Sequence, residues 1–160
     1  MALFSKKQQM HISQSIFPMA AKKEIYECRL PQLRTDKIFL KKGEICCYID
    51  KAILNTHIKR SVKQRVSHST PGLFKGTRIT TSYGKPIEYD EMKQTRGILY
   101  ITNKRIIFQA PQNAFDKPHS SLSAIQPYNN GVVLQYGSTN YELIVPDGAI
   151  IDSLLKLINN

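Results

Sequence analysis

Cationic side chains in the middle of the chain are the residues whose type and spacing best fit a chemical role. Within Ile58 to Val66, apolar residues occupy one parity and Lys or Arg much of the other. This alternation predicts a half-buried strand with a basic outer face. Two further cations follow in the next segment that has strand-forming residues. The cationic group consists of Lys59, Arg60, Lys63, Arg65, Lys75 and Arg78, of which Arg60 stands at an apolar position.

Paired strands that carry these residues would present a positive face. Arg contacts phosphate through two parallel hydrogen bonds, and Lys adds a compact point charge. We therefore expect the cationic group to bind an anionic ligand. The alternative, which stays open for any single member, is a solvated strand face that keeps the protein in solution.

Side chains suited to acid–base or metal chemistry show no pattern of that kind. The four histidines are scattered, at positions 11, 57, 68 and 119, and neither a CxxC nor an HExxH motif occurs. Glu88, Asp90 and Glu91 cluster, and paired carboxylates can transfer protons. We expect them to be solvated in a loop, or to neutralise Lys93 and Arg96. The sequence thus predicts a protein that is not an enzyme and has no catalytic residue, metal or cofactor.

The three cysteines do not form a disulfide framework. Cys46 and Cys47 are adjacent, so on a strand they would face opposite sides and could not bridge each other. Nothing near them in the sequence would lower a thiol pKa, which favours core packing over a nucleophile. We expect a reducing, cytoplasmic location, because the start of the chain also lacks the apolar run of a signal peptide.

Length and charge limit the organisation of the chain. The 160 residues, 41% of them hydrophobic, suit one domain, and no apolar run is long enough for a transmembrane segment. The net charge of +11 is uneven: residues 57–105 hold eleven basic and three acidic side chains, whereas residues 106–160 hold two and four. The positive field is therefore expected in the middle of the chain.

Turn signals divide most of the chain into short strands. We expect a turn at 41–44, then one long strand or two from Ile45 to Ile58, with a bend near Asp50. Residues 67–72 read as a loop, 83–86 as a second turn, and 87–96 as a loop with a short strand. The clearest hairpin pairs 97–102 with 105–110 across Asn103-Lys104, where Asn tolerates the left-handed conformation. Short strands are further expected at 121–128, 132–136 and 141–145.

Both ends of the chain differ from this strand pattern. Asp147 is a suitable N-cap for a terminal amphipathic helix whose apolar stripe includes Ile150, Ile151, Leu154 and Leu155. Residues 1–37 show weak patterning and are expected to form an N-terminal arm with a short helix, followed by one domain over 38–160. The predicted fold is mainly β, a partly open antiparallel barrel or sandwich capped by the C-terminal helix.

The motif GILYITNKRIIF at Gly97–Phe108 resembles the hairpin of pleckstrin-homology-like domains of the GRAM and bacterial PH type. LKKGEICCYIDKAIL at Leu40–Leu54 is similar to the opening segment of these domains, and SLSAIQPYNNGVVL at Ser121–Leu134 to a later one. The resemblance covers about residues 38–158. It implies a binding module, in which Lys104 and Arg105 have a structural role and Arg105 pairs with a carboxylate.

Three functional hypotheses follow. In the first, the basic face binds an anionic membrane lipid or phosphorylated head group, as in phosphoinositide-binding members of the resembled family, at the inner membrane surface. In the second, the domain is a protein–protein adaptor that uses a sheet edge or the arm, or assembles with itself. In the third and less favoured one, the basic face binds nucleic acid, although neither a recognition helix nor an aromatic RNA-binding motif is visible.

Overall fold

The computed structural model describes residues 11–71 and 78–160, and it describes side chains for these residues except 62–71 and 78–86. The chain divides into two compact units. The first consists of Met1–Thr56 together with Gln94–Asn160, and the second is His57–Lys93. The expected N-terminal arm falls within the first unit as far as it is described. We refer to the first unit as the body and to the second as the hairpin.

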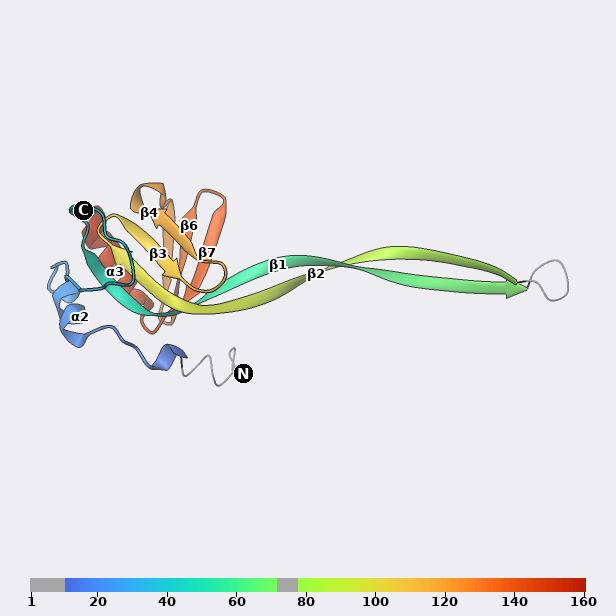
Figure 1. The fold of residues 1–160 in the computed structure, drawn as a ribbon, viewed down its shortest axis with the longest axis horizontal. Coiled ribbons are helices and arrows are strands. Elements are labelled where there is room, and N and C mark those ends of the chain that lie inside the picture. The colour runs from blue at the N-terminus through green and yellow to red at the C-terminus, as the bar shows by residue number, and fades with distance from the viewer. Residues whose placement is uncertain (1–10, 72–77) are drawn as a thin grey trace. The chain divides into compact units, whose positions relative to one another are not determined.

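The body is built around an open antiparallel sheet. Its seven strands are β1 (Cys46–Pro71), β2 (Arg78–Thr102), β3 (Arg105–Gln109), β4 (Phe115–Pro118), β5 (Ala124–Tyr128), β6 (Gly131–Tyr136) and β7 (Thr139–Ile144). They lie in the order β4-β3-β2-β1-β7-β6-β5, so β4 and β5 form the edges (Figure 1). This arrangement confirms the expected fold class: mainly β, not closed, with a C-terminal helix.

Two strands are far longer than the sequence indicated. β1 has 26 residues and β2 has 25, and both continue from the body into the hairpin. The expected loop at 67–72 is therefore wrong up to Pro71, and so are the turn at 83–86 and the loop at 87–96. All of these residues are strand, whereas Gly72 lies outside the described residues.

A physical reason explains these errors. In the hairpin each strand has one neighbour only, so a residue such as Pro86 costs no ladder hydrogen bond when its nitrogen faces the open edge. Gly and Pro therefore do not end a strand there, although they are reliable turn signals in a closed sheet. Of the two alternatives expected from Ile45 onward, one long strand or two, the structure shows one strand that runs through Asp50.

The predicted hairpins of the body are confirmed. Ile101 pairs with Ile106 across the Asn103-Lys104 turn, Tyr128 pairs with Gly131, and Tyr136 with Thr139. Asn103, however, is not among the described residues with positive φ, which are Cys28, Asn113 and two glycines. β4 was not predicted, because Phe115 is the one strongly apolar residue in its four-residue segment.

The C-terminal helix, α3 (Gly148–Asn159), begins at Asp147 as predicted. The Asp147 carboxylate accepts a hydrogen bond from the Ala149 amide at 3.1 Å. Ile150, Ile151, Leu154 and Leu155 are all buried, and the helix packs against β5 and β6. Gly148 allows this close approach, since a Cβ there would lie 2.0 Å from the Tyr128 carbonyl oxygen.

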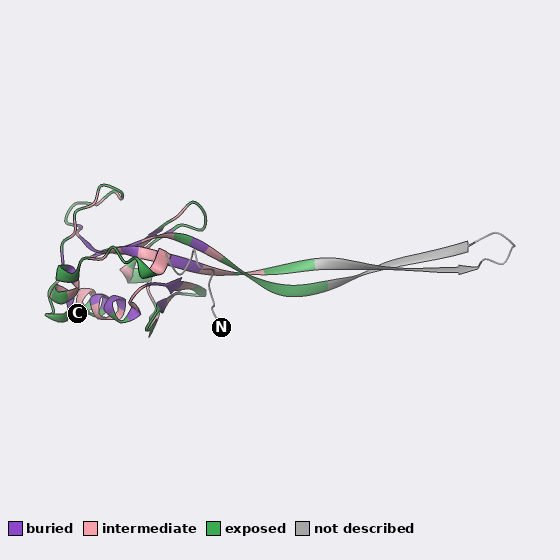
Figure 2. Cartoon of the chain, turned by 90° about the horizontal axis from the view of Figure 1, so that it is seen from below, coloured by how far each residue is buried: buried purple, intermediate pink, exposed green. Residues whose placement is uncertain are grey.

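Contacts with β1 and α3 fix the N-terminal segment to the body. The Ser15 hydroxyl and the Ile16 amide both donate to the buried Asp50 carboxylate, at 2.6 and 2.9 Å. The short helix α2 (Met19–Tyr26) buries Ala21 and Ile25 and packs against α3. The predicted short helix in this region is thus confirmed. Figure 2 shows that buried residues gather in the body, while the described part of the hairpin is largely exposed.

Candidate functional site

The hairpin contains the positively charged segment of the chain. Residues 57–86 include seven Lys and Arg residues and neither Asp nor Glu. The remaining residues of the unit add the acids Glu88, Asp90 and Glu91 together with Lys93. Within this unit, the 57–71 portion of β1 and the 78–93 portion of β2 run as a two-stranded antiparallel ribbon (Figure 1). The ribbon is therefore the candidate surface for an anionic partner.

The structure places the predicted ligand residues in different ways. Lys59 and Arg60 are neighbours on β1 and both are exposed. Lys63 and Arg65 lie further along β1 and Arg78 begins β2, but their side chains are outside the described part. Lys75 lies outside the described residues altogether. The backbone thus puts five of the six predicted residues on the two strands of one hairpin.

Arg60 forms an ion pair with Glu91 across the two strands. The expected loop for the acidic cluster is wrong, because Glu88, Asp90 and Glu91 lie on a strand, but their expected exposure to solvent is confirmed. The ion pair between Glu91 and Arg60 was not predicted from the sequence. Because Arg60 is already neutralised by a carboxylate, it is a weaker candidate for anion binding than Lys59.

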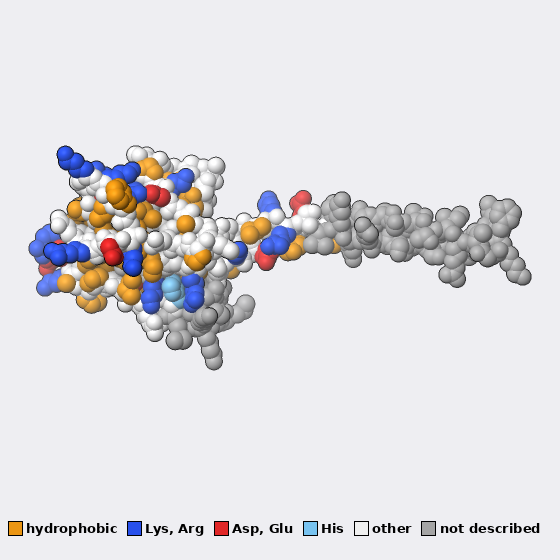
Figure 3. Space-filling view, in the orientation of Figure 1, with side chains coloured by type: hydrophobic (Ala, Val, Ile, Leu, Met, Phe, Trp, Pro, Cys, Tyr) orange, Lys and Arg blue, Asp and Glu red, His pale blue; other side chains and the backbone are white. Residues whose placement is uncertain are grey.

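Three large hydrophobic side chains lie exposed on the described part of β2 in the hairpin. Ile87, Tyr89 and Met92 have exposed fractions of 46%, 45% and 48%. Figure 3 shows hydrophobic side chains among the charged ones on this part of the hairpin. A pair of strands with apolar groups half open to water buries little surface by itself, which favours a role in contact with a partner.

A second polar assembly lies in the body, around Arg105. Its Nε donates to Glu44 Oε2 at 3.0 Å, its NH1 group donates to Asp116 at 2.5 Å, and its NH2 group donates to the Phe39 carbonyl. The expected structural role of Arg105, paired to a carboxylate, is confirmed. Burial acts to raise the pKa of Glu44, but hydrogen bonds from Arg105, Lys41 and Thr102 outweigh it and hold the pKa below its ordinary value.

The Asn103-Lys104 turn fastens the loop that precedes β1. Asn103 accepts from the Ile45 amide at 2.9 Å and donates to the Gly43 carbonyl at 3.2 Å. Lys104 Nζ donates to the Lys42 carbonyl at 2.9 Å. These contacts cannot be predicted from sequence patterns, because they join residues about 60 positions apart. The hydrogen bonds of the Asn103 side chain, rather than a left-handed backbone conformation, thus explain why an asparagine occurs at this turn.

The cysteine thiols on β1 are not suited to nucleophilic chemistry. Cys46 and Cys47 are both buried, and burial raises their pKa values to about 11 and about 12. Both thiols therefore stay protonated at neutral pH, where only a thiolate would attack an electrophile. The expectation that they pack in the core is confirmed.

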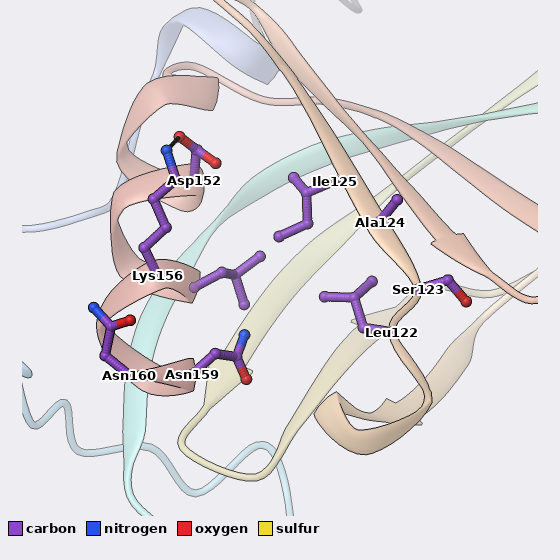
Figure 4. A pocket seen from close by; sticks show the side chains of 9 residues that line it. Leu122, Ser123, Ala124, Ile125, Asp152, Lys156, Asn159 and Asn160 are labelled. Carbon is purple, nitrogen blue, oxygen red and sulfur yellow. Dashed lines mark hydrogen bonds and ion pairs between the residues drawn. The ribbon is translucent and has the colours of Figure 1, made fainter.

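A groove of about 360 Å³ lies between α3 and the segment that leads into β5. Figure 4 shows Leu122 and Ile125 pointing from the strand side toward the helix, with Asp152 and Lys156 at the helix rim. These two charges satisfy each other at 2.8 Å. The groove therefore offers an apolar floor but assembles no group that could transfer a proton or hold an anion.

Neither a metal-ligand cluster nor a membrane-spanning helix is found in the part of the chain that the structure describes. A search for three or more neighbouring His, Cys, Asp or Glu side chains found none among those residues. A search of the same residues for a helix long and apolar enough to cross a bilayer also found none. His11, His57 and His119 lie on separate segments, and the side chain of His68 is outside the description.

Comparison with known proteins adds no relative. A scan against protein-family models gave no match, and neither a search of curated proteins nor a search of solved structures gave one.

Proposed function

We propose that this chain is a non-enzymatic binding protein whose hairpin engages an acidic membrane surface. The observation that carries the proposal is the charge of the hairpin: the sequence has seven cations and no acid over residues 57–86, all of which belong to that unit. The pleckstrin-homology-like resemblance remains a prediction and agrees with a binding role. The proposal does not depend on it.

Electrostatic attraction would supply most of the affinity. Each Lys or Arg near an anionic leaflet contributes on the order of 1 kcal/mol, and the attraction falls off within a Debye length. Several cations on one ribbon would therefore bind a leaflet together, and the binding would weaken as salt rises. The half-exposed Ile87, Tyr89 and Met92 would add interfacial contacts, because aromatic and apolar side chains settle at the headgroup level.

The absence of catalysis is part of the proposal and has its own support. Both described strand cysteines are held as thiols by burial. In the groove beside α3 the charged side chains are already paired to each other. Neither the two strand cysteines nor the groove beside α3 thus joins a nucleophile to a base.

Nucleic-acid binding is a second candidate, favoured by the form of the hairpin. A two-stranded ribbon is one of the elements that the major groove of DNA admits, and cations along it would meet phosphates. The sequence had made this the less favoured hypothesis because no recognition helix was visible, but a ribbon needs none.

Self-association through the hairpin is a third candidate, favoured by its two open strand edges. Unpaired edges are templates for strand addition. The charge of the ribbon opposes it, because two copies would bring like charges together. Among the three candidates, an acidic membrane accounts for both the charge of the hairpin and its half-exposed apolar side chains.

Vesicle flotation tests the proposal. We expect the protein to float with vesicles that contain phosphatidylserine but not with pure phosphatidylcholine, and to be released by high salt. The triple substitution Lys59→Glu, Lys63→Glu and Arg65→Glu should abolish flotation. A matched control, Lys23→Glu, Arg34→Glu and Lys117→Glu, makes the same change in net charge on the body and should retain most of it.

Equal loss in the two triple variants would mean that net charge alone drives binding. Unchanged binding of the hairpin variant would refute the site. A duplex DNA arm of the same experiment separates the second candidate: capture by DNA without capture by vesicles would replace the membrane by nucleic acid. Light scattering at matched concentrations reports self-association.

A further inference from the structure

Phe39, in the body, is the most exposed of the large hydrophobic side chains that the structure describes. Its exposed fraction is 85%, compared with 77% for Met19, the next most exposed. It lies in the loop between α2 and β1. A phenylalanine this open to water forgoes the free energy that burial of its ring would provide.

The backbone that carries Phe39 is nonetheless fastened at several points. Its carbonyl accepts from the NH2 group of Arg105, and the Lys37 carbonyl accepts from Gln109 Nε2 at 3.3 Å. Arg105 is itself held by two carboxylates, those of Glu44 and Asp116. The ring is therefore presented by an ordered loop rather than by a free tail.

The turn that follows Phe39 is fastened in the same way. The Lys41 amide donates to the Glu44 carboxylate at 2.9 Å, and the Glu44 amide donates back to the Lys41 carbonyl at 2.9 Å. Asn103 and Lys104 hold the carbonyls of Gly43 and Lys42. Because these hydrogen bonds already order the loop, the loop loses little conformational entropy when Phe39 binds a partner, and this increases the affinity.

Four exposed lysines lie on the same loop as Phe39 or on the turn bonded to it. Lys37, Lys41 and Lys42 lie within three residues of Phe39, and the Lys104 ammonium lies 2.9 Å from the Lys42 carbonyl. Asp36 is the exposed acid of the segment. The two other nearby carboxylates, Glu44 and Asp116, are both bonded to Arg105. We call Lys37, Phe39, Lys41, Lys42 and Lys104 the Phe39 corner.

We propose that the Phe39 corner is a second membrane contact, in which the Phe39 ring enters the interface of an acidic bilayer while the four lysines meet its head groups. This inference adds a second contact to the proposed function and rests on that function for the identity of the partner, an acidic membrane. A single apolar anchor or a basic patch alone gives weak attachment, whereas the two together reinforce each other.

The lysines near Phe39 favour a bilayer, rather than an apolar pocket on another protein, as the partner of its ring. A ring anchor for a protein pocket is best surrounded by neutral groups that exclude water, and Lys is depleted at the centre of such interfaces. Four exposed lysines on the loop and turn that carry one exposed ring match instead the acidic headgroups that cover a hydrocarbon layer.

The chain contains no tryptophan, so the variant Phe39→Trp introduces a single tryptophan fluorophore at the corner. With phosphatidylserine vesicles we expect a blue shift of its emission and quenching by brominated lipid chains. Tyr128→Trp is the control, since Tyr128 is 55% exposed on the edge strand β5 and should show neither change. A Phe39→Trp protein that floats with the vesicles but shows no shift overturns this inference and leaves the proposed function standing.

Phe39→Ala supplies an independent measure. Removing the ring should weaken vesicle binding about tenfold, because the apolar transfer of the ring to the bilayer interface is lost. The hairpin triple variant, made in the Phe39→Trp background, separates the two sites. A blue shift that survives in it supports the corner even if the hairpin is not a membrane site, whereas unchanged binding by Phe39→Ala contradicts the corner.

Discussion

The two units of the chain use the same strands in opposite ways. In the body, β1 and β2 are central strands whose side chains, such as those of Ile53 and Leu99, are removed from water. In the hairpin, the same two strands have only each other, and their described side chains are mostly exposed (Figure 2). Buried side chains in β1 and β2 end near Thr56 and Thr95, whereas both strands continue into the hairpin.

This difference separates stability from recognition. The body pairs its buried carboxylates internally: Asp50 accepts from Ser15 and Ile16, and Glu44 accepts from Arg105 and Thr102. The hairpin keeps its charge available on a backbone that is already hydrogen-bonded across two strands. Changes in the body should therefore alter folding, and changes in the hairpin should alter binding.

Removing Arg105 should have the largest effect on folding. Arg105→Ala leaves the Glu44 carboxylate, which is fully buried, without its charged partner. Breaking such a pair costs about 3–5 kcal/mol in the free energy of unfolding. Urea titration measures it, with Arg29→Ala as the matched control, because the exposed Arg29–Glu27 pair should contribute less than about 1 kcal/mol. Equal losses would mean that Arg105 does not fasten the body.

Truncation of one apolar side chain in each unit compares the units directly. Leu99→Ala, at a fully buried position, should lower the free energy of unfolding by about 2–5 kcal/mol. Ile87→Ala, on the same strand in the hairpin, should change it by about 0.5 kcal/mol or less. Thermal and urea unfolding of both variants check the contrast, which a large loss from Ile87→Ala would break.

The length and position of the hairpin show how far sequence reasoning could go. Alternating apolar residues identified the strands of the body, and the apolar stripe identified α3, because burial on one face leaves a periodic pattern. A two-stranded ribbon buries neither face, so its sequence needs no apolar periodicity. Gly, Pro and Ser can therefore occur within its strands, where sequence patterns wrongly indicate turns. Among the predicted ligand residues, Lys59 and Arg60 were placed correctly on a strand, but the cross-strand pair Arg60–Glu91 could not be foreseen.

Lowering the pH should weaken the body through His119. Nε2 of His119 donates to the Thr102 carbonyl at 2.7 Å, and its Nδ1 is buried with no hydrogen-bond partner. Burial lowers the pKa of His119, against the opposing effects of the Thr102 hydrogen bond and of Glu44. The unfolded chain therefore takes up a proton more readily, and stability should fall as the pH drops below the ordinary histidine value of 6.5.

Unfolding curves at pH 7.5 and pH 5.5 measure this dependence. His119→Gln should flatten the dependence in this window, although it lowers stability at both pH values by disturbing the bond to Thr102. If the His119→Gln variant keeps the full pH dependence of stability, groups other than His119 cause that dependence.

Removal of the whole hairpin should have only a small effect on folding. Replacing residues 57–93 by a short turn that contains Asn-Gly keeps the body portions of β1 and β2 and joins them directly in a tight hairpin. The free energy of unfolding should change by about 1 kcal/mol or less, since shortening a connection alters mainly its closure entropy. A body that no longer folds would show that the units are not separable.

Amide hydrogen exchange on the full chain, with and without phosphatidylserine vesicles, tests the central contrast most directly. Without vesicles, peptides that cover 46–56 and 94–102 should exchange slowly, and those that cover 57–61 and 87–93 should exchange much faster. Vesicles should slow the second pair and leave the first unchanged. Equal protection of both pairs without vesicles, or no response of the hairpin peptides to them, would contradict a stable body that carries a separate binding ribbon.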